Sequence, residues 1–403
     1  MCPCMENKRE HLYTQKVYPT VNNDDHLEFR IPPNAKAQLD LGNVMLHFVV
    51  DLPEPDDGTA KVLPQNFLGP KQFSTLEVRV NGEAVSRRSC ANEYFLSSYF
   101  QNLLNYSIDY QVSAFRSFGI FDYVQQFSPT IAAYDADTLA KFTGGRACLD
   151  LSKNNFEIIM PIDSTIFYTN SLLPSNTALD LSFERTKASI SCILSKNVSQ
   201  TDSNIELKDC YLSVPFKHDE NMFHLERNAI QRPIKLDFDE YSIKRFNVPK
   251  GTSNVLMSDI ISGQLPQKLF WGIQSMHSYG GSFNVSSTRF SKHNMIKASL
   301  FVNGKEADGF PMLMGDHHIT QPYVKFLENA RQHQNAYLSR TLGQIEYDQS
   351  NFLLSATLEP QTTGSLSFEF EFSATNIHDL VLIVCGIYDK TMRIDNQRNF
   401  QIT

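Results

Sequence analysis

Asp237 and Asp239 are the pair of carboxylates whose spacing best suits chemistry. They alternate with apolar residues in Ile234-Lys-Leu236-Asp-Phe238-Asp, so on a strand both side chains share one face. Two such carboxylates can bind Ca²⁺ or perform acid–base catalysis. The same alternation is also the ordinary solvent-exposed face of an amphipathic strand, and we favour that interpretation.

Other motifs with catalytic potential are incomplete. Asp316-His317-His318 does not match the His-x-His pair of cupin-type metalloenzymes, because neighbouring strand residues point to opposite faces. On a loop both histidines could still reach one metal, although we favour a solvated loop. Thr143-Gly-Gly-Arg146 lacks the lysine and spacing of a phosphate-binding loop, and Gly280-Gly-Ser-Phe283 lacks the second glycine of a nucleophile elbow. We therefore expect no catalytic, cofactor-binding or metal site, and no enzyme activity.

Cysteine usage and charge narrow the class of protein further. The cysteines are Cys2, Cys4, Cys90, Cys148, Cys192, Cys210 and Cys385. None has zinc-ligand spacing, so reduced thiols in a cytosolic or nuclear protein are expected. The net charge of −8 argues against a protein that coats nucleic acid with its whole surface, although weak contact between an inner face and a genome is compatible with it. The longest basic pair, Arg87–Arg88, is interpreted as a solvated turn.

Membrane and export signals are not expected. The first residues lack the apolar core of a signal peptide, and no stretch approaches the roughly 18 apolar residues that a membrane-spanning helix needs. The sequence thus favours a protein without a membrane span.

Period-two alternation is the dominant pattern and predicts strands with one buried face. It occurs in Leu27–Ile31, Leu76–Val80, Leu179–Phe183, Ile205–Lys208, Ile234–Asp239 and Leu366–Phe372. Three further segments are more uniformly apolar: Met45–Val50, Leu269–Ile273 and Leu380–Ile387. These suit central strands covered on both faces, for example at a subunit interface.

Two helices are predicted among the strands. Apolar residues within Cys90–Val112 follow a 3.6-residue spacing. A second apolar stripe begins after Thr320, which suits an N-cap, and Gly343 would end it. We interpret both stripes as helices packed on a β-core.

A weak internal repeat indicates two similar halves. The matching segments are Val80-Asn-Gly82 with Val302-Asn-Gly304, Phe29-Arg-Ile-Pro32 with Phe246-Asn-Val-Pro249, and Leu179–Phe183 with Leu366–Phe370. Asn-Gly provides the positive φ angles of a tight hairpin turn, and each turn precedes one of the two helices. The shared order of these segments favours a duplication over chance.

These patterns predict an all-β fold of two tandem eight-stranded jelly rolls, a double jelly roll, with a few short helices. The polar stretch 216–231 is the expected boundary between the halves. The predicted organisation is a flexible N-terminal arm over 1–19, a first jelly roll over 20–225 and a second over 226–403.

Turn and strand-edge motifs carry a family resemblance. Towards the C-terminus, Leu380–Ile387 runs into Tyr388-Asp389, Ile394-Asp395 and Arg398-Asn399. Further motifs are Leu172-Leu-Pro174, Arg232-Pro-Ile234, Phe246-Asn-Val-Pro-Lys-Gly251 and Gly263-Gln-Leu-Pro266. Together they resemble the hexon-like, double jelly-roll major capsid proteins of Polinton/Maverick-type elements and adintoviruses, most strongly over about 156–300 and 378–400.

The resemblance implies a structural protein of the virion. Such a chain would form homotrimers, which act as pseudo-hexagonal capsomers and build an icosahedral shell with penton or minor capsid proteins. It would be made in the host cytoplasm and assembled in the nucleus, with a host receptor as a further candidate partner and no specific nucleic-acid sequence bound. The loops Pro53–Pro70, Tyr123–Ala147 and Met276–Ser291 are the expected outer rim. The alternatives are a minor capsid or penton vertex protein and a glycan-binding jelly-roll module, because fold does not fix function.

Overall fold

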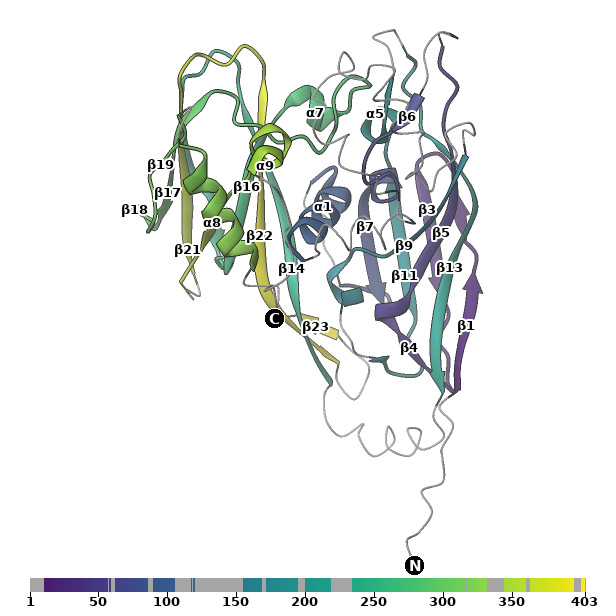
Figure 1. The fold of residues 1–403 in the computed structure, drawn as a ribbon. Helices are drawn as coiled ribbons and strands as arrows, with labels where there is room; N and C mark the ends of the chain where they lie inside the picture. Colours follow the sequence, from purple (N-terminus) through teal and green to yellow (C-terminus); the bar gives the residue numbers. More distant parts are fainter. Residues whose placement is uncertain are drawn as a thin grey trace, which may run out of the picture.

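Two β-sandwiches lie side by side in the computed structural model (Figure 1). The structure describes residues 11–56, 58, 62–85, 90–105, 117, 119, 155–168, 172–194, 200–218, 234–315, 318–331, 344–359, 363–394 and 400–402. Within these residues no helix combines the length and the hydropathy that crossing a membrane requires.

The first sandwich consists of two antiparallel sheets. Its elements are β1 (His11–Val17), β2 (Val21–Asn22), β3 (His26–Ile31), β4 (Gln38–Asp40), η1 (Leu41–Asn43), β5 (Met45–Asp51), β6 (Val62–Pro64), η2 (Pro70–Gln72), β7 (Phe73–Val80), β8 (Glu83–Ala84), α1 (Glu93–Asn105), β9 (Asn155–Pro161), η5 (Thr165–Tyr168), β10 (Leu172–Leu173), β11 (Leu179–Arg185), α5 (Ala188–Ser191), β12 (Cys192–Leu194) and β13 (Glu206–His218). The β13 sheet has the order β10-β4-β13-β5-β9, with β1 added on β13. The β11 sheet has the order β2-β3-β11-β7-β8.

The second sandwich repeats this plan. Its elements are β14 (Ile234–Val248), β15 (Asn254–Gly263), β16 (Lys268–Ser275), α7 (Met276–Gly280), β17 (Met295–Val302), β18 (Lys305–Glu306), β19 (Met312–Leu313), α8 (Thr320–Arg331), α9 (Gln344–Ser350), β20 (Leu354–Thr357), β21 (Gly364–Phe372), β22 (Leu380–Ile394) and β23 (Phe400–Ile402). The β22 sheet has the order β14-β22-β16-β20, with β23 on β22. The β21 sheet has the order β15-β21-β17-β18, with β19 on β17.

Strand order shows that the two sandwiches share one topology. The path β1-β13-β5-β9 in the first corresponds to β14-β22-β16-β20 in the second. The path β3-β11-β7-β8 corresponds to β15-β21-β17-β18. Two facing four-stranded antiparallel sheets with these crossovers form a jelly roll. The predicted all-β double jelly roll is therefore confirmed, and the two sandwiches are called the first and second roll.

The two Asn-Gly turns occupy equivalent positions. Asn81-Gly82 joins β7 to β8, Asn303-Gly304 joins β17 to β18, and all four residues have positive φ between 51° and 86°. The side chain of each asparagine also accepts a backbone hydrogen bond of 2.8 Å. Asn81 Oδ1 accepts it from the N–H of Ala178, and Asn303 Oδ1 accepts it from the N–H of Ser365. The repeat that these turns indicated is thus present in three dimensions.

One of the proposed sequence matches is wrong. Phe29-Arg-Ile-Pro32 leads out of β3, whereas Phe246-Asn-Val-Pro249 leads out of β14, which corresponds to β1. Both segments satisfy the same local rule, a strand that stops at proline, so the match reflects strand ends and not ancestry. The match between Leu179–Phe183 and Leu366–Phe370 is confirmed, because β11 and β21 are equivalent.

Both predicted helices are present with shorter bounds. α1 covers Glu93–Asn105 of the predicted Cys90–Val112. Thr320, expected as an N-cap, is the first residue of α8, and the end of that stripe, including Gly343, lies outside the described residues. The short α9 directly after Gly343 was not predicted.

The predicted flexible arm over 1–19 is contradicted in part. Residues 11–17 form β1, which pairs antiparallel with residues 212–218 of β13. The side chain of Val17 is buried, and the Tyr13 ring stacks on Phe216 with 5.4 Å between centroids, so burial of apolar area holds this strand on the sheet. Residues 1–10 and 219–233 lie outside the described residues, and so does the predicted boundary between 225 and 226.

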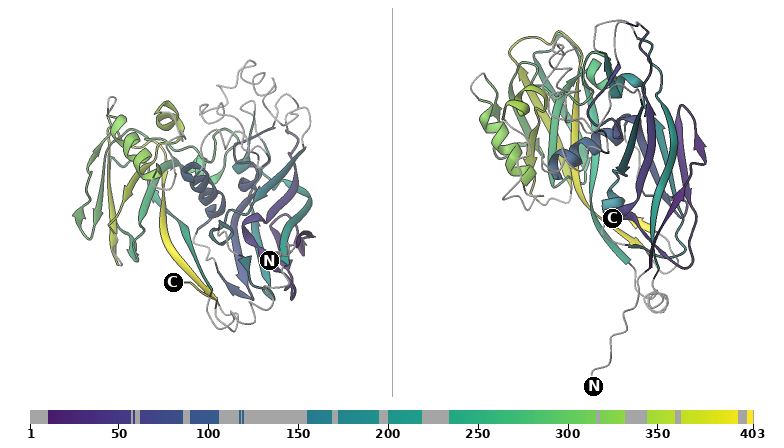
Figure 2. Two further views of the ribbon diagram at one scale, coloured as in Figure 1. Left: turned by 60° about the horizontal axis from the view of Figure 1, so that its bottom comes forward. Right: turned by 45° about the vertical axis from the view of Figure 1, so that its right-hand side comes forward.

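Each roll has its own core, but the cores exchange elements. Helix α1 belongs to the first roll by sequence, yet its apolar residues pack into the core cluster of the second roll. Conversely, Met392 and Ile394 at the end of β22 pack with the first roll. Figure 2 shows α1 lying between the two rolls. The rolls are therefore interlocked.

Candidate assembly surfaces

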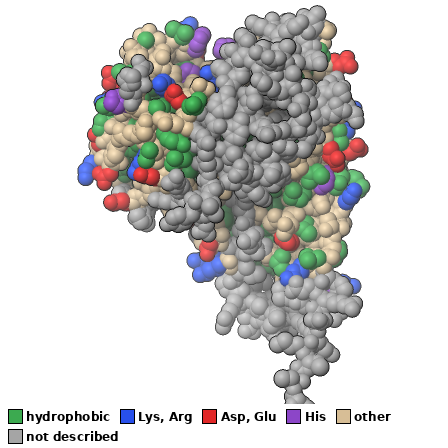
Figure 3. Space-filling model, in the orientation of Figure 1, with side chains coloured by type: hydrophobic (Ala, Val, Ile, Leu, Met, Phe, Trp, Pro, Cys, Tyr) green, Lys and Arg blue, Asp and Glu red, His purple; other side chains and the backbone are tan. Residues whose placement is uncertain are grey.

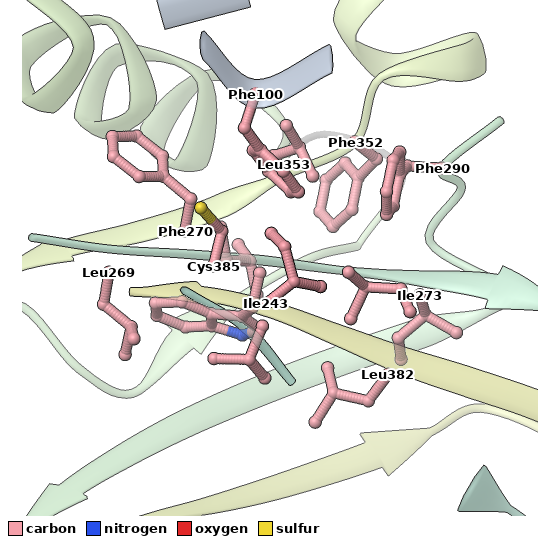
Figure 4. Close-up of a cluster of buried hydrophobic side chains, with 14 of the residues drawn as sticks. Phe100, Ile243, Leu269, Phe270, Ile273, Phe290, Phe352, Leu353, Leu382 and Cys385 are labelled. Carbon is pink, nitrogen blue, oxygen red and sulfur yellow. The ribbon is translucent and has the colours of Figure 1, made fainter. Parts of the chain in front are cut away.

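The central part of the outer face of the β22 sheet, which points away from the β21 sheet, is covered within the chain. Phe270, Ile383, Cys385 and Ile387 on this face are at most 1% exposed. Figure 4 shows Phe100 of α1, together with Phe290, Phe352 and Leu353, above this part of the sheet. The contact is so close that a Cβ on Gly272 would come within 2.7 Å of both Leu353 and Phe290.

Hydrogen bonds fix α1 in this position. The Tyr99 hydroxyl donates to Asn351 Oδ1 at 2.6 Å, and Asn105 Nδ2 donates to the Tyr241 hydroxyl at 3.0 Å. Eleven of the thirteen α1 residues are buried, which is unusual for a helix that belongs to a sandwich surface. Helix α1 thus fills the space between the two rolls.

A second contact between the rolls is polar and centres on Gln65. Its Oε1 accepts hydrogen bonds from Lys71 Nζ at 2.9 Å and from Ser287 N at 3.1 Å, while its Nε2 donates to Cys192 O at 2.9 Å. Lys71 Nζ also donates to Thr288 Oγ1 at 3.3 Å. Complete burial lowers the pKa of Lys71 well below its usual value, and the nearby Cys192 offsets this only in part.

Within the described residues, no such cover lies on the equivalent outer face of the first roll. On the β13 sheet, Met45, Val49, Ile159, Tyr211 and Pro215 point away from the core and are half-buried. Figure 3 shows hydrophobic side chains on the right-hand flank, where β1, β13 and β5 lie in Figure 1. Apolar side chains on an open sheet face mark an interaction surface.

Aromatic contacts run across this face. The Tyr211 ring lies 4.4 Å from His47 and 6.2 Å from Tyr18, and Lys16 Nζ lies 4.2 Å from the Tyr211 centroid. Burial lowers the pKa of His47; Glu157 acts in the opposite direction, and Lys16 lowers it further. The same face also carries charged side chains, among them Lys208, which pairs with Asp51 at 2.6 Å and with Glu206 at 3.3 Å.

Helix α8 also differs from its counterpart α1. Both follow the equivalent hairpin, but Gln321, Val324 and Glu328 of α8 are exposed along one side. An open groove of about 580 Å³ beside this side is lined by Met312, Val324 and other residues. We call the exposed side of α8, together with exposed Ile345 on the neighbouring α9, the α8 face.

Exposed large hydrophobic side chains gather on these two surfaces. Eight are found in the described residues: Leu12, Tyr13, Tyr18, Leu256, Leu313, Val324, Ile345 and Ile377. Leu12, Tyr13 and Tyr18 lie on or beside β1, and Val324 and Ile345 lie on the α8 face. Both surfaces lie on different flanks of the molecule, so one copy could use the first and its neighbour the second.

The chemical motifs of the sequence do not assemble into a site within the described residues. Asp237 Oδ1 accepts a hydrogen bond of 2.6 Å from Thr391 Oγ1, which fits a solvated strand face. No group of three His, Cys, Asp or Glu side chains in the described ranges could hold a metal. His318 is exposed, whereas Asp316-His317, Thr143–Arg146 and Arg87–Arg88 lie outside them. Among the described cysteines, Cys90, Cys192, Cys210 and Cys385 are free thiols.

The expected outer rim needs correction. Parts of Pro53–Pro70 and Met276–Ser291 are buried between the rolls, because Gln65 and Ser287 bond to each other and Phe290 enters the shared core. Tyr123–Ala147 lies outside the described residues. Proline, glycine and polar residues correctly predicted loops in Pro53–Pro70 and Met276–Ser291. They did not indicate that these loops pack against the other roll.

Sequence comparison finds no relative: no protein-family model matches the chain, and no curated protein matches it. Comparison of folds, in contrast, finds similar solved structures. A structure of the Sputnik virophage has a TM-score of 0.62 at 11% identity and covers 100% of this chain and 91% of its own. The PBCV-1 virus capsid gives 0.61 at 10% identity, with 100% and 98% covered. The mavirus major capsid protein gives 0.56 at 10% identity, with 97% and 90% covered. The chain thus has the double jelly-roll fold of these capsid structures over nearly its whole length.

Proposed function

We propose that this chain is a viral major capsid protein that forms homotrimers, which act as pseudo-hexagonal capsomers of an icosahedral shell. The fold neighbours are capsid structures, and the motifs quoted above support a relation to the Polinton/Maverick and adintovirus lineage. Its location would be the virion, after synthesis in the host cytoplasm and assembly in the nucleus. Penton or minor capsid proteins and a host receptor are its proposed partners, and it has no catalytic role.

One observation carries the proposal of a ring. Within the described residues, the outer face of the β22 sheet is covered by α1 of the other roll together with α8 of its own, whereas the equivalent face of the β13 sheet and the α8 face have no such cover. If the contact between the rolls is repeated between chains, the α8 face of one copy covers the β13 sheet of the next. A contact between two different surfaces forms a closed ring when the rotation from one copy to the next adds up to a full turn. With three copies, such a ring contains six rolls.

The first experiment is the mass of the purified full-length chain in solution, combined with negative-stain imaging. We expect a trimer of the 45.9 kDa chain with a pseudo-hexagonal outline. A pentamer would instead support the vertex protein, and a monomer that binds glycans would support the sugar-binding module. A monomer that never assembles would end the capsid proposal while leaving the fold unchanged.

Val324→Glu should weaken the trimer by at least tenfold, because it places an unpaired carboxylate in the proposed contact, where burial of such a charge costs about 2–5 kcal/mol. Tyr18→Glu should do the same from the opposite surface. The matched control is Leu256→Glu, which changes a leucine on β15 that is as exposed as Tyr18 and lies away from both surfaces. Sedimentation across a dilution series gives the dissociation constants. Equal values for Val324→Glu and Leu256→Glu would exclude the α8 face from the contact.

A further inference from the structure

A cluster of basic side chains lies at one end of the second roll, beside the turn that leads into β17. The rings of His277 and His378 are 6.4 Å apart, and His293 and Arg289 flank the same turn. Burial, with smaller contributions from Arg289 and His378, lowers the pKa of His293 to about 4.

The carboxylates near this cluster have other partners. Asp379 Oδ1 accepts a hydrogen bond of 3.0 Å from the backbone N–H of Lys250. Asp348 Oδ1 of α9 lies 3.6 Å from the Nζ atom of Lys292, which belongs to the same turn. Neither is among the groups that shift the pKa of His293. A proton on His293 would therefore place a positive charge beside Arg289.

This turn is mechanically connected to the contact between the rolls. Phe290 is fully buried three residues before the histidine, and its ring lies 5.6 Å from Tyr99 and 5.9 Å from Phe100 of α1. Its backbone donates to Ser350 O at 2.9 Å and accepts from Phe352 N at 3.2 Å. Displacement of the turn would pull on the residue that fills the space between the rolls (Figure 4).

The geometry points to an acid-sensitive latch: protonation of His293 between Arg289 and His378 displaces residues 289–294 and loosens the packing of Phe290 between the two rolls. Ser291 Oγ lies 2.9 Å from His293 Nε2, and this bond alone does not decide the outcome, because a hydroxyl can donate or accept. The outcome is determined by the burial of the His293 ring and by the repulsion between its protonated form and Arg289. A capsid of such subunits would weaken in an acidic compartment, a consequence that rests on the proposed function, whereas the latch itself does not.

The direction of the pH effect follows from linkage. The folded pKa of His293, about 4, lies below the usual 6.5, so the unfolded chain binds the proton more readily. Stability is fully present above pH 6.5 and falls as the pH drops from 6.5 towards 4. Between pH 7.5 and 5 the unfolding constant should rise about 30-fold through this one group.

The test measures urea unfolding of the full-length chain at pH 7.5 and 5, together with hydrogen exchange of residues 289–294 corrected for its intrinsic pH dependence. His293→Gln should remove most of the 30-fold change and the extra exchange at pH 5. Arg289→Gln should reduce both only in part, because burial is the larger cause. His218→Gln, at a half-buried histidine on β13 of the other roll, is the matched control and should keep the wild-type pH dependence.

The difference between pH 7.5 and 5 is decisive, not the stability at either pH, so a variant that is destabilised overall still gives an answer. A wild-type pH dependence in His293→Gln would overturn the proposal. So would faster exchange at pH 5 that spares residues 289–294. Neither result depends on whether the chain forms trimers, so failure of the latch and failure of the capsid proposal remain distinguishable.

Discussion

Phe290→Ala is expected to lower the free energy of unfolding by about 3–5 kcal/mol, the usual cost of removing a fully buried phenylalanine. Phe290 is 0% exposed and contacts two aromatic rings of α1. The cavity would not collapse easily, because Gly272 on the sheet below has no side chain to fill it. The loss should also appear as weaker coupling between the rolls.

Urea unfolding can be followed through Trp271, the single tryptophan of the chain, which is buried in the core of the second roll. Its indole lies 4.8 Å from Phe368 and 5.7 Å from Phe310, so its fluorescence reports on that core. Phe301→Ala, at a partly exposed position on β17, is the control and should cost under about 1 kcal/mol. Similar losses for both variants would show that Phe290 does not hold the rolls together.

The strands could be predicted because their cause is local. Alternation in Leu366–Phe372 and the Asn-Gly turns depend only on neighbouring residues, and both appear where expected. The interlocking of the rolls has a non-local cause. α1 and α8 have similar apolar stripes, but α1 also buries a polar side, where Asn102 Nδ2 donates to Ser98 O at 2.7 Å. No periodicity in the sequence indicates that this second side is covered.

The assembly surface was only partly foreseeable. Uniformly apolar Met45–Val50, Leu269–Ile273 and Leu380–Ile387 predicted strands covered on both faces, and β16 and β22 confirm this within one chain. β5 is covered on one face only, and its outward Met45 and Val49 remain half-buried. The apolar pattern of Met45–Val50 thus predicts that the outward face of β5 is covered, whereas the described residues of a single copy do not cover it. The α8 face could not be found in this way, because one exposed valine does not alter an amphipathic pattern.

Lys71→Met is expected to raise the free energy of unfolding at pH 7 by about 1–3 kcal/mol, the opposite of the usual effect of a core substitution. Lys71 is 0% exposed, and the groups that accept its hydrogen bonds, Gln65 and Thr288, are both neutral. The acceptor Gln65 Oε1 keeps Ser287 as a donor after the change, so no buried acceptor loses its last partner. A methionine would fill a similar volume without any cost of neutralising or burying an amine.

The pH dependence of this gain provides the sharper test. The folded pKa of Lys71 is lowered well below 10.5, so the unfolded chain binds the extra proton and wild-type stability rises with pH up to that value. The advantage of Lys71→Met over the wild type should therefore shrink as the pH rises from 7 towards 10. Gln65→Met is the matched control and should destabilise by several kcal/mol, because Lys71 and Ser287 would both lose their common acceptor. A loss of more than about 1 kcal/mol for Lys71→Met would show that the amine contributes net stability to the contact between the rolls.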